Sequence, residues 1–581
     1  MEMIKGNKAT KIFLYVSLLA FISFVIYILY INQEVLYTAH DRSEFINGAP
    51  FFHTLLSKPF GLMQYAGAWL TQLFYYPALG AGVLMAIWAL IFIVGAKAFR
   101  LQGNAPAMML LPIACLLASI VDLGYWIYIS PITGYWFSQS LGYLVMLLCL
   151  WAARCTQRKW HLVWYLLAFF AYPVLGWFAL LFVLCLALSD KLTLRELLGI
   201  LLLFVTAYIW RALLYSDQKA EVVKLAGFPH FETPLDEGEH LSIPFWALSA
   251  VTLLILLCGR YLSQWFVPVI CAVAGIIFTL ALMFQDRNYI DEMRMVRYAT
   301  DDNWEEVLHV AEDTRQPTVS MVMLRNIAMM NEGGLLDRSF KLGNNGGEVN
   351  TPDSLHVRLL NIASPLVYYN YGMMNEAIRL GFENAIQTGF SPFYLKMLSR
   401  CALASGDEKL VERYTTLLHH HPFYSNWLPA PVSKTVKELQ NSYPDELTGT
   451  ENSDSYVVNT ISLWYESDSK VASEQALFYS MIRRDSGRFW KSLRKYVKLH
   501  PNDKFPLHAQ EAYIMFMDKS PEEKRLMLPV EQNVYEHYKQ FWEALEKQAK
   551  PGMELEQIGE SMRKDWGGTY WWYNIFGRRI Y

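Results

Sequence analysis

The two halves of the chain differ in how apolar and polar positions alternate. From Ile12 to Phe284 many apolar runs are long enough to cross a bilayer, because about 20 apolar residues in a helix span its hydrocarbon core. After Phe284 no run reaches this length, and charged residues alternate with apolar ones at helical spacing. The pattern predicts an all-α protein with a transmembrane helical domain over residues 1–284 and a water-soluble helical domain over residues 285–581.

Most of the apolar runs read as single membrane spans. The clear spans are 12–31, 77–97, 105–127, 135–153, 195–215, 244–262 and 265–284. The run from Trp160 to Leu188 would make a helix of about 44 Å, for a hydrocarbon core of about 30 Å. Pro173 and Gly176 lie in its middle, so it forms either one kinked span or two short helices joined by a turn. The first alternative gives eight spans and the second nine, and we favour about nine.

The basic residues set the expected orientation. Lysines at 5, 8 and 11 precede the first span, which favours an uncleaved anchor with a cytoplasmic N-terminus. With nine spans, the basic residues at 191–195 and 260 also lie inside, and the second half lies outside. With eight spans the second half is cytoplasmic. We expect a multi-pass protein of a bacterial inner membrane with a periplasmic second half and the lipid bilayer as a partner.

The connection over residues 32–76 is the most unusual one. It is predicted to be external, and it carries several ionisable residues in its first part. Its last part, from Tyr65 to Tyr76, is rich in aromatic residues. Such a segment is typical of an interfacial helix whose Trp69, Tyr75 and Tyr76 lie at the level of the lipid headgroups.

The second half contains a weak internal period. Gly372 and Gly406 are 34 residues apart, and Leu380 corresponds to Tyr414 at the same offset. A period of 34, with a small residue at the turn between helices, resembles tetratricopeptide repeats. An irregular helical bundle is the alternative. Stacked helix pairs leave a concave surface, so this resemblance implies a domain that binds a partner protein.

Charge and cysteine content mainly exclude certain partners and kinds of site. The net charge is −3, and basic and acidic residues are interspersed in the second half, so we expect no nucleic-acid partner. The seven cysteines form no CxxC pair, so neither a disulfide framework nor a zinc ribbon is predicted. The chain contains no GxSxG, HExxH or Walker sequence, and its motifs therefore leave open whether it is an enzyme.

Two conspicuous clusters have simple structural interpretations. Adjacent residues on a helix point in different directions, so residues 419–421, three histidines, suit a helix C-terminus better than a metal site. The aromatic segment over residues 566–576 is expected to dock on the last helices and cover their core.

Four ionisable residues of the first half are candidates for chemistry. Asp41 and Glu44 lie in the external connection, where a carboxylate could act as a general base. Asp122 and Arg211 lie near the outer ends of their spans, where ionisable groups are costly and often functional. An arginine there could hold a lipid-linked phosphate. The alternative is structural: these groups pair, extend to the interface or cap helices.

Three short sequences carry a resemblance to known enzymes. They are His40-Asp41-Arg42-Ser43-Glu44, Lys58-Pro59 and the turn at Tyr172-Pro173. Together with the order of spans, they resemble the membrane half of GT-C glycosyltransferases. The resemblance implies Asp41 and Glu44 as catalytic residues and His40, Arg42, Lys58, Asp122 and Arg211 as substrate-binding residues. It also implies a polyprenyl-phosphate-linked sugar donor and a divalent metal as an optional cofactor.

The whole chain also resembles an uncharacterised bacterial family of polytopic proteins with helical-repeat tails. The residues that carry this likeness are 371–377 and 568–573. We therefore expect a membrane protein that presents its second half for protein binding in the cell envelope. The alternative is a GT-C-like glycosyltransferase on the outer face of the membrane.

Overall fold

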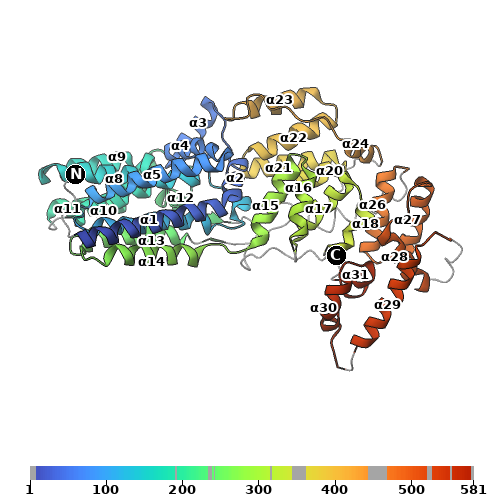
Figure 1. Ribbon diagram of the computed structural model, residues 1–581. Helices are drawn as coiled ribbons and strands as arrows, with labels where there is room; N and C mark the ends of the chain where they lie inside the picture. Colours follow the sequence, from blue (N-terminus) through green and yellow to red (C-terminus); the bar gives the residue numbers. More distant parts are fainter. Residues whose placement is uncertain are drawn as a thin grey trace.

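The chain forms an elongated, almost entirely helical molecule. Figure 1 shows the computed structural model, which describes residues 8–189, 193–232, 239–240, 242–314, 317–342, 362–442, 468–519, 527–549 and 552–577. Within these ranges the extended elements are the two-residue antiparallel strands β1 (Phe231–Glu232) and β2 (Glu239–His240). The first half, here called the bundle, occupies one end of the molecule, and the second half, the tail, occupies the other (Figure 1). The all-α fold class is confirmed.

Fewer helices qualify as membrane spans than the apolar runs predict. Four helices in the described part of the chain are long and apolar enough: α1 (Lys8–Ile31), α5 (Pro77–Ala98), α8 (Tyr135–Cys155) and α11 (Leu194–Leu213). A fifth candidate is the pair α14 (Val267–Leu282) and α15 (Arg287–Thr300), which is bent by 70°. These helices associate the protein with a membrane, and the expected number of about nine spans is wrong.

The number of spans was overestimated because the remaining apolar runs contain shorter helices. These helices have 12 to 16 residues and are α6 (Leu110–Val121), α9 (His161–Leu175), α10 (Trp177–Leu188), α13 (Ile243–Cys258) and α14 (Val267–Leu282). At 1.5 Å per residue they reach only about 18–24 Å, against a hydrocarbon core of about 30 Å. The run at 105–127, for example, begins with the 3₁₀ helix η2 (Ala105–Met109), and its α-helix ends before Asp122.

The run from 160 to 188 folds back on itself, as the two-helix alternative requires. The helix breaks at Gly176, whose φ of 52° and ψ of −126° lie outside helical space. The rings of Trp164 and Phe182 are then 6.3 Å apart, although 18 residues in one straight helix would separate them by about 27 Å. The two-helix arrangement is therefore confirmed, although neither helix reaches the length of a span.

The turn at Gly176 gives a direct test of this hairpin. A Cβ at Gly176 would lie 2.1 Å from the carbonyl oxygen of Ala226, and its φ of 52° is unfavourable for other residues. Gly176→Ala is expected to destabilise the protein by about 1–3 kcal/mol, measured as a lower thermal unfolding midpoint in detergent. Gly82→Ala is the matched control, because a Cβ there meets nothing within 4 Å. Equal midpoints for the two variants would contradict the hairpin geometry.

The connection after α1 is itself helical. It contains α2 (Gln33–Asp41), α3 (Ala49–Leu56), α4 (Gly61–Thr71) and the 3₁₀ helix η1 (Gln72–Tyr75). The predicted aromatic helix corresponds to α4 and η1. Trp69 and Tyr76 are more than half exposed there, immediately before α5 begins.

The tail consists of short helices packed mostly against their neighbours in the chain. In its first part these are α15 (Arg287–Thr300), α16 (Trp304–Glu312), α17 (Val319–Glu332), α18 (Leu335–Arg338), η4 (Ser339–Lys341), α20 (Ser364–Asn370), α21 (Met374–Thr388), α22 (Pro392–Ala404), α23 (Glu408–His419) and α24 (Lys434–Gln440). In its second part they are α26 (Lys470–Ile482), α27 (Ser486–Leu499), α28 (Leu507–Lys519), α29 (Gln532–Gln548), α30 (Leu555–Trp566) and α31 (Tyr570–Phe576). Many start at side-chain caps, such as Asn303 before α16 and Asp407 before α23.

The 34-residue period coincides with two successive helix pairs. Gly372 precedes α21 and Gly406 precedes α23, with φ angles of 75° and 73°. Both glycines therefore occupy the left-handed turn between the two helices of a pair, which glycine adopts without steric cost. Leu380 and Tyr414, which correspond in the period, are both buried. The helical second half is confirmed, together with this correspondence.

The two smaller structural interpretations also hold. His419 is the last residue of α23, and its side chain contacts the carbonyl oxygen of Trp427 at 2.9 Å. The aromatic segment forms α31 and is buried against the preceding helices. Trp571 donates to the carbonyl oxygen of Glu511 at 2.9 Å, and the backbone N–H of Tyr570 donates to the Glu511 carboxylate at 2.8 Å.

Candidate functional site

The predicted site residues lie where the bundle meets the tail. Helix α2 follows α1 directly, and it packs on η1 and α5 of the bundle and on α15 and α22 of the tail. Val35, Leu36 and Ala39 are buried in the core, which continues from the bundle into the tail. Four polar side chains of α2 are buried as well, so each must find a partner: Glu34, Thr38, His40 and Asp41. We call this region the junction.

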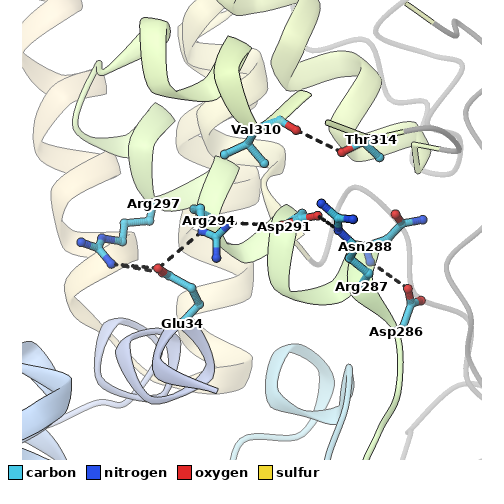
Figure 2. Close-up of polar contacts among 9 residues, drawn as sticks. All are labelled: Glu34, Asp286, Arg287, Asn288, Asp291, Arg294, Arg297, Val310 and Thr314. Carbon is cyan, nitrogen blue, oxygen red and sulfur yellow. Dashed lines mark hydrogen bonds and ion pairs between the residues drawn. The ribbon is translucent and has the colours of Figure 1, made fainter. Parts of the chain in front are cut away.

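Glu34 joins the start of α2 to the first helix of the tail. Arg297 donates to the Glu34 carboxylate at 3.1 Å, and Arg294 lies 3.8 Å from it (Figure 2). Arg294 also pairs with Asp291 at 3.2 Å, one turn earlier on α15. The Arg297 guanidinium lies 4.6 Å from the centre of the Tyr37 ring. One carboxylate of the connection therefore holds two arginines of the tail.

Asp41 forms a buried ion pair with Lys396 of α22. The distance between Asp41 Oδ1 and Lys396 Nζ is 3.0 Å, and the two side chains are only 9% and 5% exposed. Burial alone would lower the pKa of Lys396, but the negative charge of Asp41 outweighs it and holds the pKa well above its usual value. Lys396 is therefore charged at neutral pH. The carboxylate of Asp41, the predicted general base, is therefore paired with a cation of the tail.

Arg42 lies in an aromatic box made by both halves. Its guanidinium is 3.6 Å from the centre of the Phe393 ring, 5.0 Å from Tyr128 and 5.3 Å from Tyr394. It donates to the Tyr394 hydroxyl at 3.1 Å and to the carbonyl oxygen of Ile362. Stacking on aromatic faces and fixed multiple donation are properties of arginine that lysine lacks. Arg42 thus links the connection to α7 (Trp126–Ile129) and to the tail.

His40 and His421 are buried neutral imidazoles. A hydrogen bond of 3.1 Å joins His40 Nε2 and the Tyr424 hydroxyl, and the two rings are stacked. Burial lowers the pKa of His40 to about 4. Burial and the neighbouring His40 lower the pKa of His421 to about 3. Neither imidazole carries a proton charge at neutral pH, which suits a packed contact.

Glu44 borders a small cavity of about 20 Å³, enough for about one water molecule. The cavity is lined by Ala39, Arg42, Ser43, Glu44, Leu123, Ile127, Pro131, Ile132, Thr133, Tyr135, Trp136, Phe231 and Thr388. Burial raises the pKa of Glu44, against the opposing charge of the exposed Lys58. The cavity therefore combines a carboxyl group, a guanidinium and aromatic rings.

The other two predicted residues lie apart from this cluster. Asp122 is the C-cap of α6 and neighbours Leu123, which lines the cavity. Arg211 lies in the last turn of α11 and donates to the carbonyl oxygen of Gln218 at 3.3 Å. The structure thus brings together His40, Asp41, Arg42, Glu44 and Lys58, places Asp122 at their border and leaves Arg211 in its own loop.

The tail partners were not found from the sequence. Lys396, Tyr394 and Tyr424 are more than 350 residues from α2, and nothing local in the sequence pairs them with it. One signal was available: Lys396 and Arg400 are the charged residues of the otherwise apolar α22 and are one turn apart. Arg400 pairs with Asp302 in a second tail contact. In the described residues no group of three or more His, Cys, Asp or Glu could hold a metal.

Comparison with known proteins gives a family but no activity. The profile of a family of unknown function, DUF6057, matches residues 8–577. No curated protein and no solved structure matches the chain. Because the match covers nearly the whole chain, bundle and tail together, the protein belongs to the family of unknown function DUF6057.

Proposed function

We propose that the protein is a membrane-anchored platform whose helical tail binds an acidic surface of a partner protein in the cell envelope. In this proposal the membrane is a bacterial inner membrane, the N-terminus is cytoplasmic and the tail is periplasmic. The helix pairs of the tail act in the manner of tetratricopeptide repeats, which offer a stacked surface to a partner.

The observation that carries the proposal is a basic face on α27. Arg488, Lys491, Arg494 and Lys498 are exposed and follow one another at spacings of three or four residues, so they share one side of the helix. Residues 486–499 contain no acidic residue, and Arg488 pairs at 3.3 Å with Asp485, the N-cap of the helix. The opposite side of the helix, with Phe489 and Leu493, is buried. The helix lies at the end of the molecule opposite the bundle (Figure 1).

Along α27 the charged residues are all basic, whereas basic and acidic residues are interspersed over the second half as a whole. A row of cations at the far end of an anchored domain attracts an acidic surface and speeds its approach.

The junction supports the same proposal. Two ion-pair clusters, at Glu34 and Asp41, and the aromatic box around Arg42 hold the tail against the bundle. A tail held at several buried points keeps its partner surface in a fixed orientation, which reduces the ordering cost of binding.

Charge reversal on α27 tests the proposal in the full-length protein. Lys491→Glu/Lys498→Glu is compared with Lys409→Glu/Arg413→Glu, a matched pair of exposed cations on α23. A photo-crosslinker at Arg488 is used in cells, and the captured proteins are quantified by mass spectrometry. We expect an acidic partner that the α27 variant loses and the α23 variant keeps. The same captured proteins at the same yield in all variants, or capture of nucleic acid, would contradict the proposal.

A GT-C-like glycosyltransferase is the second candidate, and the cavity beside Glu44 is the observation that favours it. A carboxyl group beside an arginine and three aromatic rings is a common setting for a sugar and its phosphate. In that reading Glu44 is the base, a divalent metal is an optional cofactor and the donor is polyprenyl-linked. The platform is the better-supported proposal, because Asp41 is paired with Lys396 and the cavity holds about one water.

A further inference from the structure

The tail exposes large apolar side chains at the end that faces the bundle. Leu428 is 70% exposed and Phe423 is 43% exposed, both in the segment between α23 and α24. Ile386, near the end of α21, is 63% exposed. Side chains of this size contribute about 1.5–3 kcal/mol each when they are fully removed from water. Their position near the bundle therefore calls for an apolar neighbour.

Phe423 is held in an unusual backbone conformation that keeps it against the bundle. Its φ is 72°, a region that costs a residue with a side chain about 1–2 kcal/mol. Its ring stacks on Tyr75 with centres 5.1 Å apart and an interplanar angle of 9°, and it meets Tyr76 at 5.7 Å. Trp427, one residue before Leu428, packs into the same cluster as Tyr75. Phe423 and Tyr424 thus contact the aromatic pair at 75–76, and Trp427 follows one turn after Phe423.

The position of Tyr75 and Tyr76 indicates the level of this contact relative to the membrane. Tyr76 directly precedes α5, a helix of 22 residues that is long and apolar enough to cross a membrane. A residue at the end of a span lies at the boundary between hydrocarbon and headgroups, where Trp and Tyr are enriched. Tyr76 and Trp69 are both more than half exposed, as residues of such a belt are.

Ile386 lies at the same end of the bundle. Thr388, two residues later, lines the cavity together with Tyr135, the first residue of α8. Helix α8 is another candidate span, and its start lies beside α4, because Gly67 and Gly134 are in close contact. Exposed apolar residues from two segments of the tail therefore reach the level at which two spans begin.

We propose that the tail contacts the bilayer directly, with residues 423–428 in the headgroup region beside Tyr76 and Ile386 at the same depth. The occupant of this apolar surface is lipid, because Phe423 packs on Tyr75 and Tyr76 at the start of a candidate span. The contact sets the orientation of the tail relative to the membrane, in addition to the junction. It does not depend on the partner proposed for α27.

Photo-crosslinking to lipid tests the contact in the full-length protein. p-Benzoylphenylalanine replaces Leu428, Ile386, Trp69 or Leu555, one position at a time. The protein is reconstituted in vesicles of phosphatidylethanolamine and phosphatidylglycerol and irradiated, and lipid adducts are quantified by mass spectrometry. Leu555 is the matched control: it is 59% exposed in the tail and lies at the start of α30, away from the bundle (Figure 1).

The expected result is a lipid adduct at 428 and 386 that is several-fold more abundant than at 555 and comparable to that at 69. Adduct yields at 428 and 386 no higher than at 555 would overturn the proposal. Crosslinks from 428 to a second copy of the chain instead of lipid would overturn it too. If no lipid adduct forms at position 69, the expected boundary of the membrane is not where the proposal puts it. This result would overturn the proposal as well.

Discussion

Lys396→Met is expected to destabilise the protein by about 3–5 kcal/mol, because it leaves the buried carboxylate of Asp41 without its cation. Both side chains are almost fully buried, so water cannot replace the lost partner. The measurement is the thermal unfolding midpoint of the full-length protein in detergent, followed by circular dichroism. Midpoints are compared among variants, because a protein with two parts does not unfold in a single two-state step.

Two further variants control this experiment. Lys409→Met removes an exposed cation from the neighbouring α23 and is expected to change stability by no more than about 0.5 kcal/mol. Asp41→Asn/Lys396→Met removes both charges and is expected to recover most of the loss. If Lys396→Met is as stable as Lys409→Met, the ion pair does not hold the junction.

The second large effect is expected on acidification. The pKa of His40 is about 4 and that of His421 about 3 in the folded protein, against about 6.5 in the unfolded chain. The unfolded chain therefore takes up protons first as the pH falls. The stability from these neutral imidazoles is fully present above pH about 6.5 and is lost progressively toward pH 4 and 3. A change in the pKa from 6.5 to about 4 corresponds to about 3 kcal/mol for His40.

Variants without these imidazoles show how much the two histidines contribute to the pH dependence of the unfolding midpoint. His40→Gln/His421→Gln is expected to show a smaller fall of the unfolding midpoint between pH 7 and pH 4.5 than the unaltered protein. His309→Gln, at an exposed position of α16, is the control and is expected to leave the profile unchanged. A double variant with the unaltered slope would show that the two histidines titrate in the folded protein as they do in water.

The overestimated span number shows the limit of hydropathy. The length of an apolar run reports how many consecutive residues avoid water. It does not report where a helix within that run begins or ends. The runs around α6, α13 and α14 are as apolar as those of the four candidate spans, but their helices end early. Caps, turns and 3₁₀ segments such as η2 set those ends, and they depend on neighbouring helices.

For the candidate site as well, the sequence indicated the residues but not their contacts. Ionisable residues in an otherwise apolar half singled out residues 40–44 as candidates, since burying such groups is costly. The expectation assumed that they faced a substrate cavity. In the structure Asp41 and Arg42 are bound by Lys396, Phe393 and Tyr394, and Glu44 borders the small cavity.

By itself the sequence determined the apolar first half and the charged helical second half, and it indicated the helix pairs around Gly372 and Gly406. It offered the turn at Gly176 as one of two alternatives. These properties follow from local spacing and backbone preference, which neighbouring residues carry. Only the tertiary structure decided which helices reach span length, which tail residues meet α2, and where the cations of α27 and the apolar residues at 423–428 lie. Such contacts join positions hundreds of residues apart, and the chain must fold before their burial and charge can be assigned.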